Sequence, residues 1–543
     1  MASRRSVTRF IAQGITAVVA VGTVAALTAF GPIALESAGL DSASGTTTDV
    51  RVVEPQPAPV VVACPPGVKL PEGADVGDSA FAAGSDHTTT VTVSGVAGHT
   101  LAGTAIVEYQ PEAHEAPLLG GVTSSVTPTG DLRGLAAGSC SLPSTEQWLV
   151  AGNTEPGNTA LLTVTNPSSG AATVTLRAFG GAGPLALGSG GVMVVGPGES
   201  SQVRLEAIAP GERRLAVSVQ SEGARVDASM QVQMRESLVP RGTDTVESSV
   251  LARSVVVTGI VSTGHAIEDP AAPALRLLNP GDDATEATLR VFGPAGEVTL
   301  RGLETVALEP GVVTDVLLGG LEAGRFSVLA ESDAPLAAAG MYQRTGEPAK
   351  DAVVTGKPVD VSWIAGQAWP VTPGQGSSQR NNVGSSVVTL PPGTAATVNL
   401  VNLGGLIPVT ASLTGYDAHG AVLGVYAVDV AARSTASVAV SEMFPDGNVA
   451  MLVLAGDDQA TADQAANDQS TGDLATPDQA ANDQSTGDLA IPDQPATSPA
   501  LAWNVGLTAS DDSEAKNTLI TTVTPVREPE NTSVVRVEPV VAR

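Results

Sequence analysis

The sequence predicts an all-β protein in which tandem β-sandwich domains follow a single N-terminal transmembrane helix. Three observations predict this class: short apolar runs bounded by turn residues, an internal repeat, and an apolar leader. The 543 residues include 59 Gly and 38 Pro, so the chain has many points where it can turn. Residues 88–93 and 172–176 alternate with a period of two and are rich in Thr and Val. Such alternation is typical of half-buried strands.

The composition restricts both the cores and the partners. Hydrophobic residues make up 43% of the chain but aromatic residues only 3%, so the cores must consist of Val, Ala and Leu. The formal net charge is −29. Because nucleic acid and anionic lipid surfaces attract basic proteins, this charge argues against sequence-independent binding to either of them. We therefore expect no nucleic-acid partner.

The apolar leader predicts insertion into a membrane. Arg4, Arg5 and Arg9 precede an uncharged stretch, and a bilayer span needs about 20 residues. The first charges after the stretch are acidic, which predicts that the N-terminus stays inside the cell. The predicted segments are a cytoplasmic N-terminus at 1–9, a transmembrane signal anchor at 10–35 and a linker rich in Gly, Ser, Thr and Pro at 36–59.

A cleaved signal peptide is the alternative to an anchor. Its apolar core would normally be about 7–15 residues long and would precede an Ala-x-Ala-like site. Here the apolar stretch is longer, and the best of several weak cleavage sites is Ser42-Ala43-Ser44. We therefore expect a single-pass protein of the cell membrane whose bulk is extracytoplasmic, with secretion after cleavage as the alternative.

The two cysteines, Cys64 and Cys140, both follow the predicted span. In an oxidising compartment such a pair is most simply one disulfide, which would contribute about 4–5 kcal/mol in the chain-entropy description. Two buried free thiols are the alternative. Because neither cysteine has metal-type spacing or a catalytic Cys/His context, we expect the disulfide.

An internal repeat organises most of the chain. The first copy contains Leu162-Thr-Val-Thr-Asn166-Pro167 and the second contains Leu275-Arg-Leu-Leu-Asn279-Pro280. The same distance separates each Asn from a later Pro-Gly pair, Pro197-Gly198 or Pro310-Gly311. A third, more degenerate copy has Asn402 followed by Leu403. We interpret these steps as turns, because Asn bonds its own backbone, Pro fixes φ and Gly supplies positive φ.

The spacing of the copies suits closed β-sandwiches of about 100 residues, of the immunoglobulin-like kind, and is too long for solenoid repeats. The predicted divisions are an N-terminal β region at 60–150, sandwich repeats at 151–250, 251–360 and 361–508, and C-terminal strands with a tail at 509–543. Residues 534–539 echo residues 50–55, so these terminal segments are candidates to pair as strands.

The third repeat carries an acidic insertion at 456–498. Residues 460–474 recur almost unchanged as 475–489, so the tract is a hairpin loop expanded by tandem duplication. Its acids, small residues and lack of aromatics cannot form a core, and we expect it to be disordered. Calcium binding by its aspartates is the alternative, but the glycine-rich nonapeptide of calcium-binding rolls is absent.

The sequence contains no local catalytic, cofactor or metal motif. None of the five histidines has zinc-ligand spacing, and neither His-Glu-x-x-His nor Gly-x-Ser-x-Gly occurs. Gly374-Gln-Gly376 is half of a dinucleotide fingerprint in a loop-like context. The four tryptophans are Trp148, Trp363, Trp369 and Trp503, for which we expect packing rather than glycan stacking. A carboxylate pair assembled in space would leave no motif.

Several features follow one another in a recognisable order. They are the signal anchor, Cys64-Pro-Pro, Cys140 before a Trp-containing strand, the Leu-x-x-x-Asn-Pro repeats and the joint from Arg235 to Gly242. This order resembles an uncharacterised family of secreted or membrane-anchored proteins of high-GC actinobacteria, known only as a domain of unknown function. The resemblance implies a Gram-positive-type cell envelope and a β-domain architecture, and it supplies no catalytic residues. The duplicated tract is foreign to the family pattern.

These features predict a non-catalytic scaffold or interaction protein of the cell envelope. We expect no enzymatic activity, no cofactor and no metal site, and a partner that is another envelope protein or wall glycan. The alternative is an envelope enzyme that binds or hydrolyses wall glycan at a site without a local motif.

Overall fold

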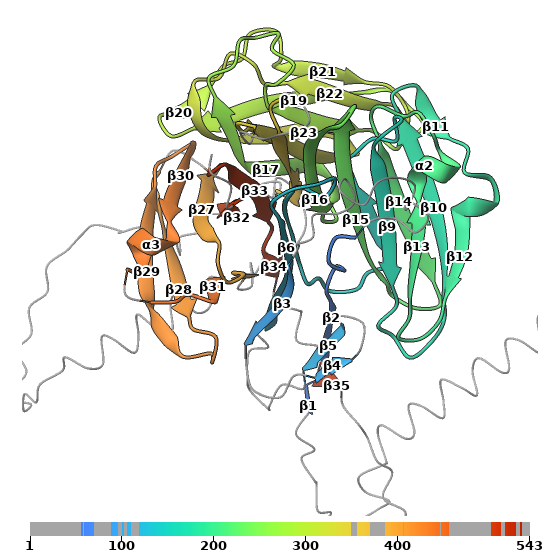
Figure 1. The fold of residues 1–543 in the computed structure, drawn as a ribbon. Helices are drawn as coiled ribbons and strands as arrows, with labels where there is room; N and C mark the ends of the chain where they lie inside the picture. The colour runs from blue at the N-terminus through green and yellow to red at the C-terminus, as the bar shows by residue number, and fades with distance from the viewer. Residues whose placement is uncertain are drawn as a thin grey trace, which may run out of the picture. The chain divides into compact units, whose positions relative to one another are not determined.

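The structure is a computed structural model whose regular elements are almost all strands, which confirms the all-β prediction (Figure 1). It describes residues 56–57, 59–69, 88–95, 100–102, 106–109, 119–348, 356–369, 386–404, 407–445, 447–455, 501–511, 516–527 and 533–534. Among these residues, no helix has the length and apolar character to span a bilayer. The predicted anchor at 10–35, its flanks Arg4, Arg5 and Arg9, and the acidic insertion at 456–498 lie outside them.

Three modules of antiparallel strands follow the same strand order; the first and third each have two sheets, and in the second, one long strand joins the two into a single sheet of nine strands. In the first module one sheet has the order β11-β10-β14-β8, with β12 also on β10, and the other has the order β13-β9-β15-β16. The strands are β8 (Glu146–Leu149), β9 (Thr159–Thr165), β10 (Ala172–Gly180), β11 (Gly183–Leu185), β12 (Val192–Val195), β13 (Ser200–Arg204), β14 (Ala216–Glu222), β15 (Asp227–Glu236) and β16 (Val239–Val246).

The second module repeats this arrangement around one long strand, β23 (Ala323–Thr345). The first half of β23 pairs with β17 and β19, and its second half pairs with β18 and β24, so it contributes to both layers. The other strands are β17 (Leu251–Thr263), β18 (Ala274–Leu278), β19 (Thr285–Gly293), β20 (Gly296–Val298), β21 (Thr305–Leu308), β22 (Val313–Leu317), β24 (Val359–Ala365) and β25 (Gln367–Ala368).

The third module has sheets of order β29-β28-β31-β26-β34 and β30-β27-β32-β33. Its strands are β26 (Ser386–Thr389), β27 (Ala395–Asn402), β28 (Val409–Tyr416), β29 (Val422–Val430), β30 (Ser434–Ala439), β31 (Met451–Leu454), β32 (Leu501–Ser510), β33 (Thr518–Val523) and β34 (Val526–Arg527). Short helices α2 (Leu205–Ile208) and α3 (Val440–Met443) occupy corresponding places in the first and third modules.

The alternating apolar side chains of each module form a core, and these cores also take in side chains of neighbouring parts, such as Trp363 of the second module in the first core and Leu135 of the N-terminal region in the third. In β10 the inward residues Ala172, Val174 and Leu176 are buried while the threonines between them are exposed. This is the alternation that the sequence shows, and it explains how Val, Ala and Leu suffice for cores with few aromatics.

One asparagine at the end of the second strand of each module holds a turn together. Its side-chain amide donates to the carbonyl of a residue that ends a neighbouring strand. The three bonds run from Asn166 to Val195 (3.0 Å), from Asn279 to Leu308 (3.2 Å) and from Asn402 to Val430 (3.3 Å). The Asn-Pro steps of the sequence are therefore structural turns, as their chemistry predicts.

The strand pairing places the ends of the modules differently from the sequence divisions. β8 starts at Glu146 and pairs with β14, so it belongs to the first module. β24 crosses the 360/361 division and pairs with β23 of the second module. β33 lies in the segment 509–543 and pairs with β32 of the third module. The repeated Asn-Pro and Pro-Gly steps mark only the middle strands, and the first and last strands carry no such signal.

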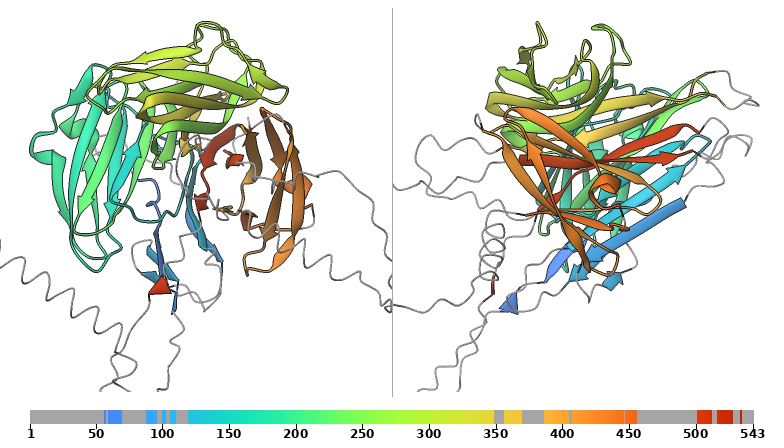
Figure 2. Two further views of the ribbon diagram at one scale, coloured as in Figure 1. Left: turned by 180° about the vertical axis from the view of Figure 1, so that it is seen from behind. Right: turned by 90° about the vertical axis from the view of Figure 1, so that its left-hand side faces the viewer.

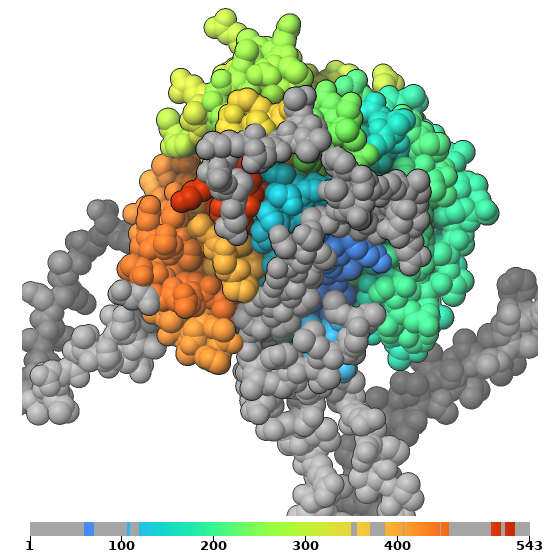
Figure 3. All heavy atoms as spheres, in the orientation of Figure 1, coloured from blue at the N-terminus to red at the C-terminus, as the bar shows by residue number. Residues whose placement is uncertain are grey.

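The N-terminal strands form two small sheets, of order β2-β5-β4 and β3-β6-β7. They are β2 (Val60–Ala63), β3 (Thr88–Gly95), β4 (Thr100–Ala102), β5 (Ile106–Tyr109), β6 (Leu119–Thr127) and β7 (Gly134–Ser139). Cys64 and Cys140 form a disulfide between the ends of β2 and β7. In the space-filling view the coloured part of this N-terminal region lies between the first and third modules (Figure 3).

The two ends of the described chain also meet. β1 (Gln56–Pro57) pairs with β35 (Ser533–Val534) in an antiparallel ladder. The predicted pairing of residues 50–55 with 534–539 lies almost entirely outside the described residues.

Candidate functional site

Strand β7 packs against β16, β24 and β33, which are end strands of one layer in the first, second and third modules, and these strands also pack against one another (Figure 2). We call this meeting point the junction. Close approach of the strands requires glycine at Gly242 of β16, where φ is 111° and a Cβ would lie 2.6 Å from the backbone nitrogen of Val361. The junction joins the N-terminal region to all three modules.

Buried carboxyl groups occupy the junction. Asp244 is fully buried and accepts hydrogen bonds from the N–H of Trp363 at 2.7 Å and the Thr521 hydroxyl at 2.7 Å. These donors come from the second and third modules, whereas Asp244 belongs to the first. Burial raises the pKa of Asp244 well above its usual value.

Asp360 plays the same part from the second module. Its Oδ2 accepts from the N–H of Ile520 at 2.7 Å and of Leu135 at 3.3 Å, while its buried Oδ1 has no partner among the described residues. Burial raises the pKa of Asp360 to about 7, against which the Arg133 guanidinium acts. Arg133 itself pairs with buried Asp511 at 3.2 Å.

Two further acids lie where the N-terminal region meets the modules. Glu247 accepts from the N–H of Ser139 at 2.6 Å and from the N–H of Thr524 at 2.9 Å, and burial raises its pKa. Asp227 accepts from the Ser141 hydroxyl, and burial raises its pKa to about 7. All these acids bond groups from other parts of the chain, so their chemistry serves assembly.

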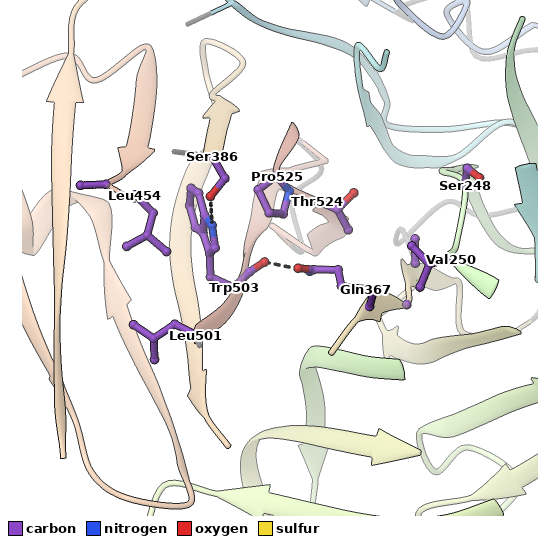
Figure 4. Close-up of a pocket in the computed structure, with 13 residues that line it drawn as sticks. Ser248, Val250, Gln367, Ser386, Leu454, Leu501, Trp503, Thr524 and Pro525 are labelled. Atoms are coloured by element: carbon purple, nitrogen blue, oxygen red, sulfur yellow. Dashed lines mark hydrogen bonds between the residues drawn. The ribbon is translucent and has the colours of Figure 1, made fainter. Parts of the chain in front are cut away.

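A cavity with a volume of about 310 Å³ lies between the second and third modules (Figure 4). The Trp503 indole N–H donates to the Ser386 hydroxyl at 2.8 Å, and the Gln367 amide donates to the Trp503 carbonyl at 2.9 Å. The lining residues that the structure describes are uncharged: Ser248, Val250, Ala365, Gly366, Gln367, Ala368, Ser386, Leu454, Ala455, Leu501, Trp503, Thr524 and Pro525. This described part of the lining suits a neutral occupant.

The tryptophans pack rather than present exposed rings. Trp148, Trp363 and Trp503 are buried, and Trp369 packs partly buried against a small cluster of the second and third modules. The Arg276 guanidinium lies 4.9 Å from the centre of the Trp363 ring. The described structure therefore has no exposed aromatic platform from these four residues.

Thr263, His265 and Asp269 form a hydroxyl–imidazole–carboxylate series after β17. The distances are 2.9 Å from the Thr263 hydroxyl to Nε2 and 3.0 Å from Nδ1 to the carboxylate. The N–H of Ala271, and then His265, lower the pKa of Asp269, and the ionised carboxylate accepts from Nδ1–H of His265. None of the three residues lines the cavity described above.

The structure places the predicted cysteines together and brings no three potential metal ligands into one group among its described residues. Sequence reasoning missed the junction acids. Asp244 and Asp360 lie in Thr243-Asp244-Thr245 and Val359-Asp360-Val361, where an acid alternates with β-branched residues. Because an ordinary strand whose acid faces solvent shows the same alternation, nothing in the sequence signals that these two carboxyl groups are buried.

The profile of a family of unknown function (DUF5719) matches residues 73–441, which is well over half of the chain. The chain belongs to this family. No curated protein and no solved structure matches the chain. The match confirms the resemblance to an uncharacterised family. It runs from the N-terminal strands of the DUF5719 protein through two modules and into the third as far as α3.

Proposed function

We propose that this DUF5719 protein is a non-catalytic scaffold or interaction protein of an actinobacterial cell envelope. In this proposal residues 10–35 anchor the chain in the membrane, and the three modules are immunoglobulin-like β-sandwiches presented outside it. The paired-sheet order and the core of each module support the sandwich class. The partner is another envelope protein or wall glycan.

The observation that carries the proposal is the junction. Its acids are buried, and they accept hydrogen bonds from main-chain N–H groups of neighbouring modules. A chain that fixes three modules against one another in this way presents their loops and edge strands in a constant arrangement. Such an arrangement suits recognition by several surfaces at once.

Membrane topology is the first test. In cells that produce the chain with a C-terminal tag, we expect the tag in the membrane fraction and accessible to protease added outside. Replacing Arg4, Arg5 and Arg9 together by Glu should reduce that accessibility, because the arginines set the orientation. Replacing three exposed arginines of the modules instead should leave it unchanged. A tag found in the cytosol with both thiols free would refute the proposal.

Partner capture is the second test. Crosslinking of intact cells, followed by purification through the tag, should recover one envelope component. An Asp244→Lys variant places a charge where the modules meet and should lose that component while the anchor persists. A component recovered equally with the anchor segment alone would contradict a role for the modules.

The alternative is an envelope enzyme that acts on wall material, and the Thr263–His265–Asp269 series is the observation that favours it. Release of soluble fragments from purified wall material, abolished by His265→Ala, would favour the enzyme. The scaffold proposal expects retention on the wall or on a partner without fragment release.

A further inference from the structure

The first and second modules carry the same arginine over the same aromatic ring. β10 ends in Leu176-Arg177-Ala178-Phe179-Gly180, and β19 ends in Leu289-Arg290-Val291-Phe292-Gly293. The Arg177 guanidinium lies 5.3 Å from the centre of the Phe179 ring, and that of Arg290 lies 5.0 Å from the Phe292 ring. A guanidinium held over a ring keeps its edge free for hydrogen bonds.

In the second module a carboxylate bonds the free edge of the Arg290 guanidinium. Arg290 Nε and Nη2 donate to the two oxygens of Glu297 at 2.8 Å and 3.0 Å. This bidentate bond lowers the pKa of Glu297. An arginine held over a phenylalanine in this way therefore accommodates a carboxylate in bidentate geometry.

In the first module the carboxylate is missing. Pro184 lies opposite Phe179 in the ladder, as Glu297 lies opposite Phe292. Among the described residues no side chain forms an ion pair or hydrogen bond with the exposed Arg177. The third module has Thr414 in the corresponding strand, so the free arginine is specific to the first module.

A pocket of about 260 Å³ opens beside Arg177. β12 pairs with β10 from Ala172 to Thr175 and β11 pairs with it from Ala178 to Gly180, which leaves a gap between β11 and β12. Besides Arg177, the walls are largely apolar and include Phe179, Pro184, Leu185, Leu187 and Val192.

We propose that this pocket binds a carboxylate on a short apolar chain, with the carboxylate meeting Arg177 as Glu297 meets Arg290. The guanidinium supplies two parallel donors that match a carboxylate, and the apolar walls accommodate an aliphatic chain. This site does not depend on the scaffold proposal.

The test is a titration of the purified full chain with 5,5,5-trifluoropentanoate, followed by fluorine NMR. We expect millimolar binding, weakened about tenfold or more by Arg177→Gln and by replacing the acid with its amide. Arg225→Gln, which removes the same charge from an exposed position of the same module, should have no effect. Pro184→Glu should abolish binding while keeping Arg177, because it supplies an internal carboxylate.

If Pro184→Glu disturbs the contact of Pro184 with the second module, the Arg177→Gln variant still tests the proposal. Absence of binding, equal binding of the amide, or unchanged binding by Arg177→Gln would overturn the proposal. A parallel titration with N-trifluoroacetyl-Ala-Val identifies the source of the ligand. Binding about tenfold tighter than that of trifluoropentanoate would assign the C-terminus of a polypeptide, and equal binding would assign a small organic acid.

Discussion

The first and second modules show how one arrangement of strands accommodates different side-chain partners. Corresponding positions hold Thr163 and Gln202 in the first module, which share a hydrogen bond of 3.0 Å. In the second module the same positions hold Arg276 and Asp315, which form an ion pair at 2.7 Å. The local polar pair is retained, but only the second version extends beyond its own module.

Arg276 reaches into the first module with its remaining donors. Its Nη1 donates to the carbonyl of Gly152 at 2.6 Å and to that of Leu215 at 3.3 Å, and the side chain is almost fully buried. The comparison teaches that the strand order and the asparagine turns define a module, whereas a few substituted pairs define how modules join and what they bind.

The largest expected effect comes from removing the joining arginine. Arg276→Ala leaves two carbonyl groups without their donor and leaves Asp315 with only its longer ion pair to Arg214, at 3.8 Å, so we expect a loss of about 3 kcal/mol. The matched control is Arg290→Ala, which removes a more exposed pair within the second module and should cost less than about 1 kcal/mol. Urea unfolding of both variants measures the difference. Equal midpoints would break the distinction between joining and local pairs.

The pH dependence of stability should have opposite signs at the junction and on the module surface. Burial raises the pKa of Asp360 in the folded protein to about 7. The contribution of Asp360 to the free energy of unfolding is therefore complete below the ordinary pKa of an aspartate, and it is lost as the pH rises through about 7. Asp360→Asn should remove on the order of 3 kcal/mol of this dependence. The melting temperature, measured from about pH 5 to about pH 8, reports it.

Glu297 is the contrasting case, because Arg290 lowers its folded pKa. The contribution of Glu297 to the free energy of unfolding is present above the ordinary pKa of a glutamate, and it is lost as the pH falls through the lowered pKa of the folded protein. Glu297→Gln should therefore leave the melting curve between about pH 5 and about pH 8 unchanged in shape. A loss of the alkaline destabilisation in this variant would contradict the assignment to the junction.

A smaller effect separates the turn asparagines. Asn166 has partners for both ends of its amide, including the N–H of Ser168 at 3.0 Å, whereas Oδ1 of Asn402 has none among the described residues. Asn166→Ala should cost about 1–3 kcal/mol, and Asn402→Ala should cost less. The melting temperatures of the two variants measure this difference. A larger loss of stability for Asn402→Ala would show that the turn of the third module depends more on its asparagine than the turn of the first does.

The smallest effect concerns backbone strain after the edge strands. Arg433 has φ of 53° in the turn between β29 and β30, while Gly198 has φ of 70° in the corresponding turn of the first module. Arg433→Gly relieves this strain but also removes the exposed ion pair of Arg433 with Glu297 at 3.5 Å, so it should change stability by no more than about 0.5 kcal/mol, whereas Gly198→Ala should destabilise the protein by about 1 kcal/mol. A larger drop in melting temperature for Arg433→Gly than for Gly198→Ala would rule out this explanation.

Sequence patterns predicted the parts of this fold that depend on residues close together in the chain. Alternation marked β10, and the Asn-Pro step marked the turn that Asn166 holds. The sequence did not predict the packing of β16, β24 and β33, because their polar residues face other modules and not solvent. The sequence did not predict the Arg177 pocket either. That the Arg177 guanidinium has no carboxylate partner in the described part of the chain is apparent only when it is compared with Arg290, which bonds Glu297.

The long strand β23 has a mechanical consequence. It forms ladders in both layers of the second module, with β17 and β19 along its first half and β18 and β24 along its second. Tension applied along β23 therefore loads both layers in shear together, and neither layer can detach without the other. The middle module is the one we expect to rupture last when the chain is pulled from its two ends.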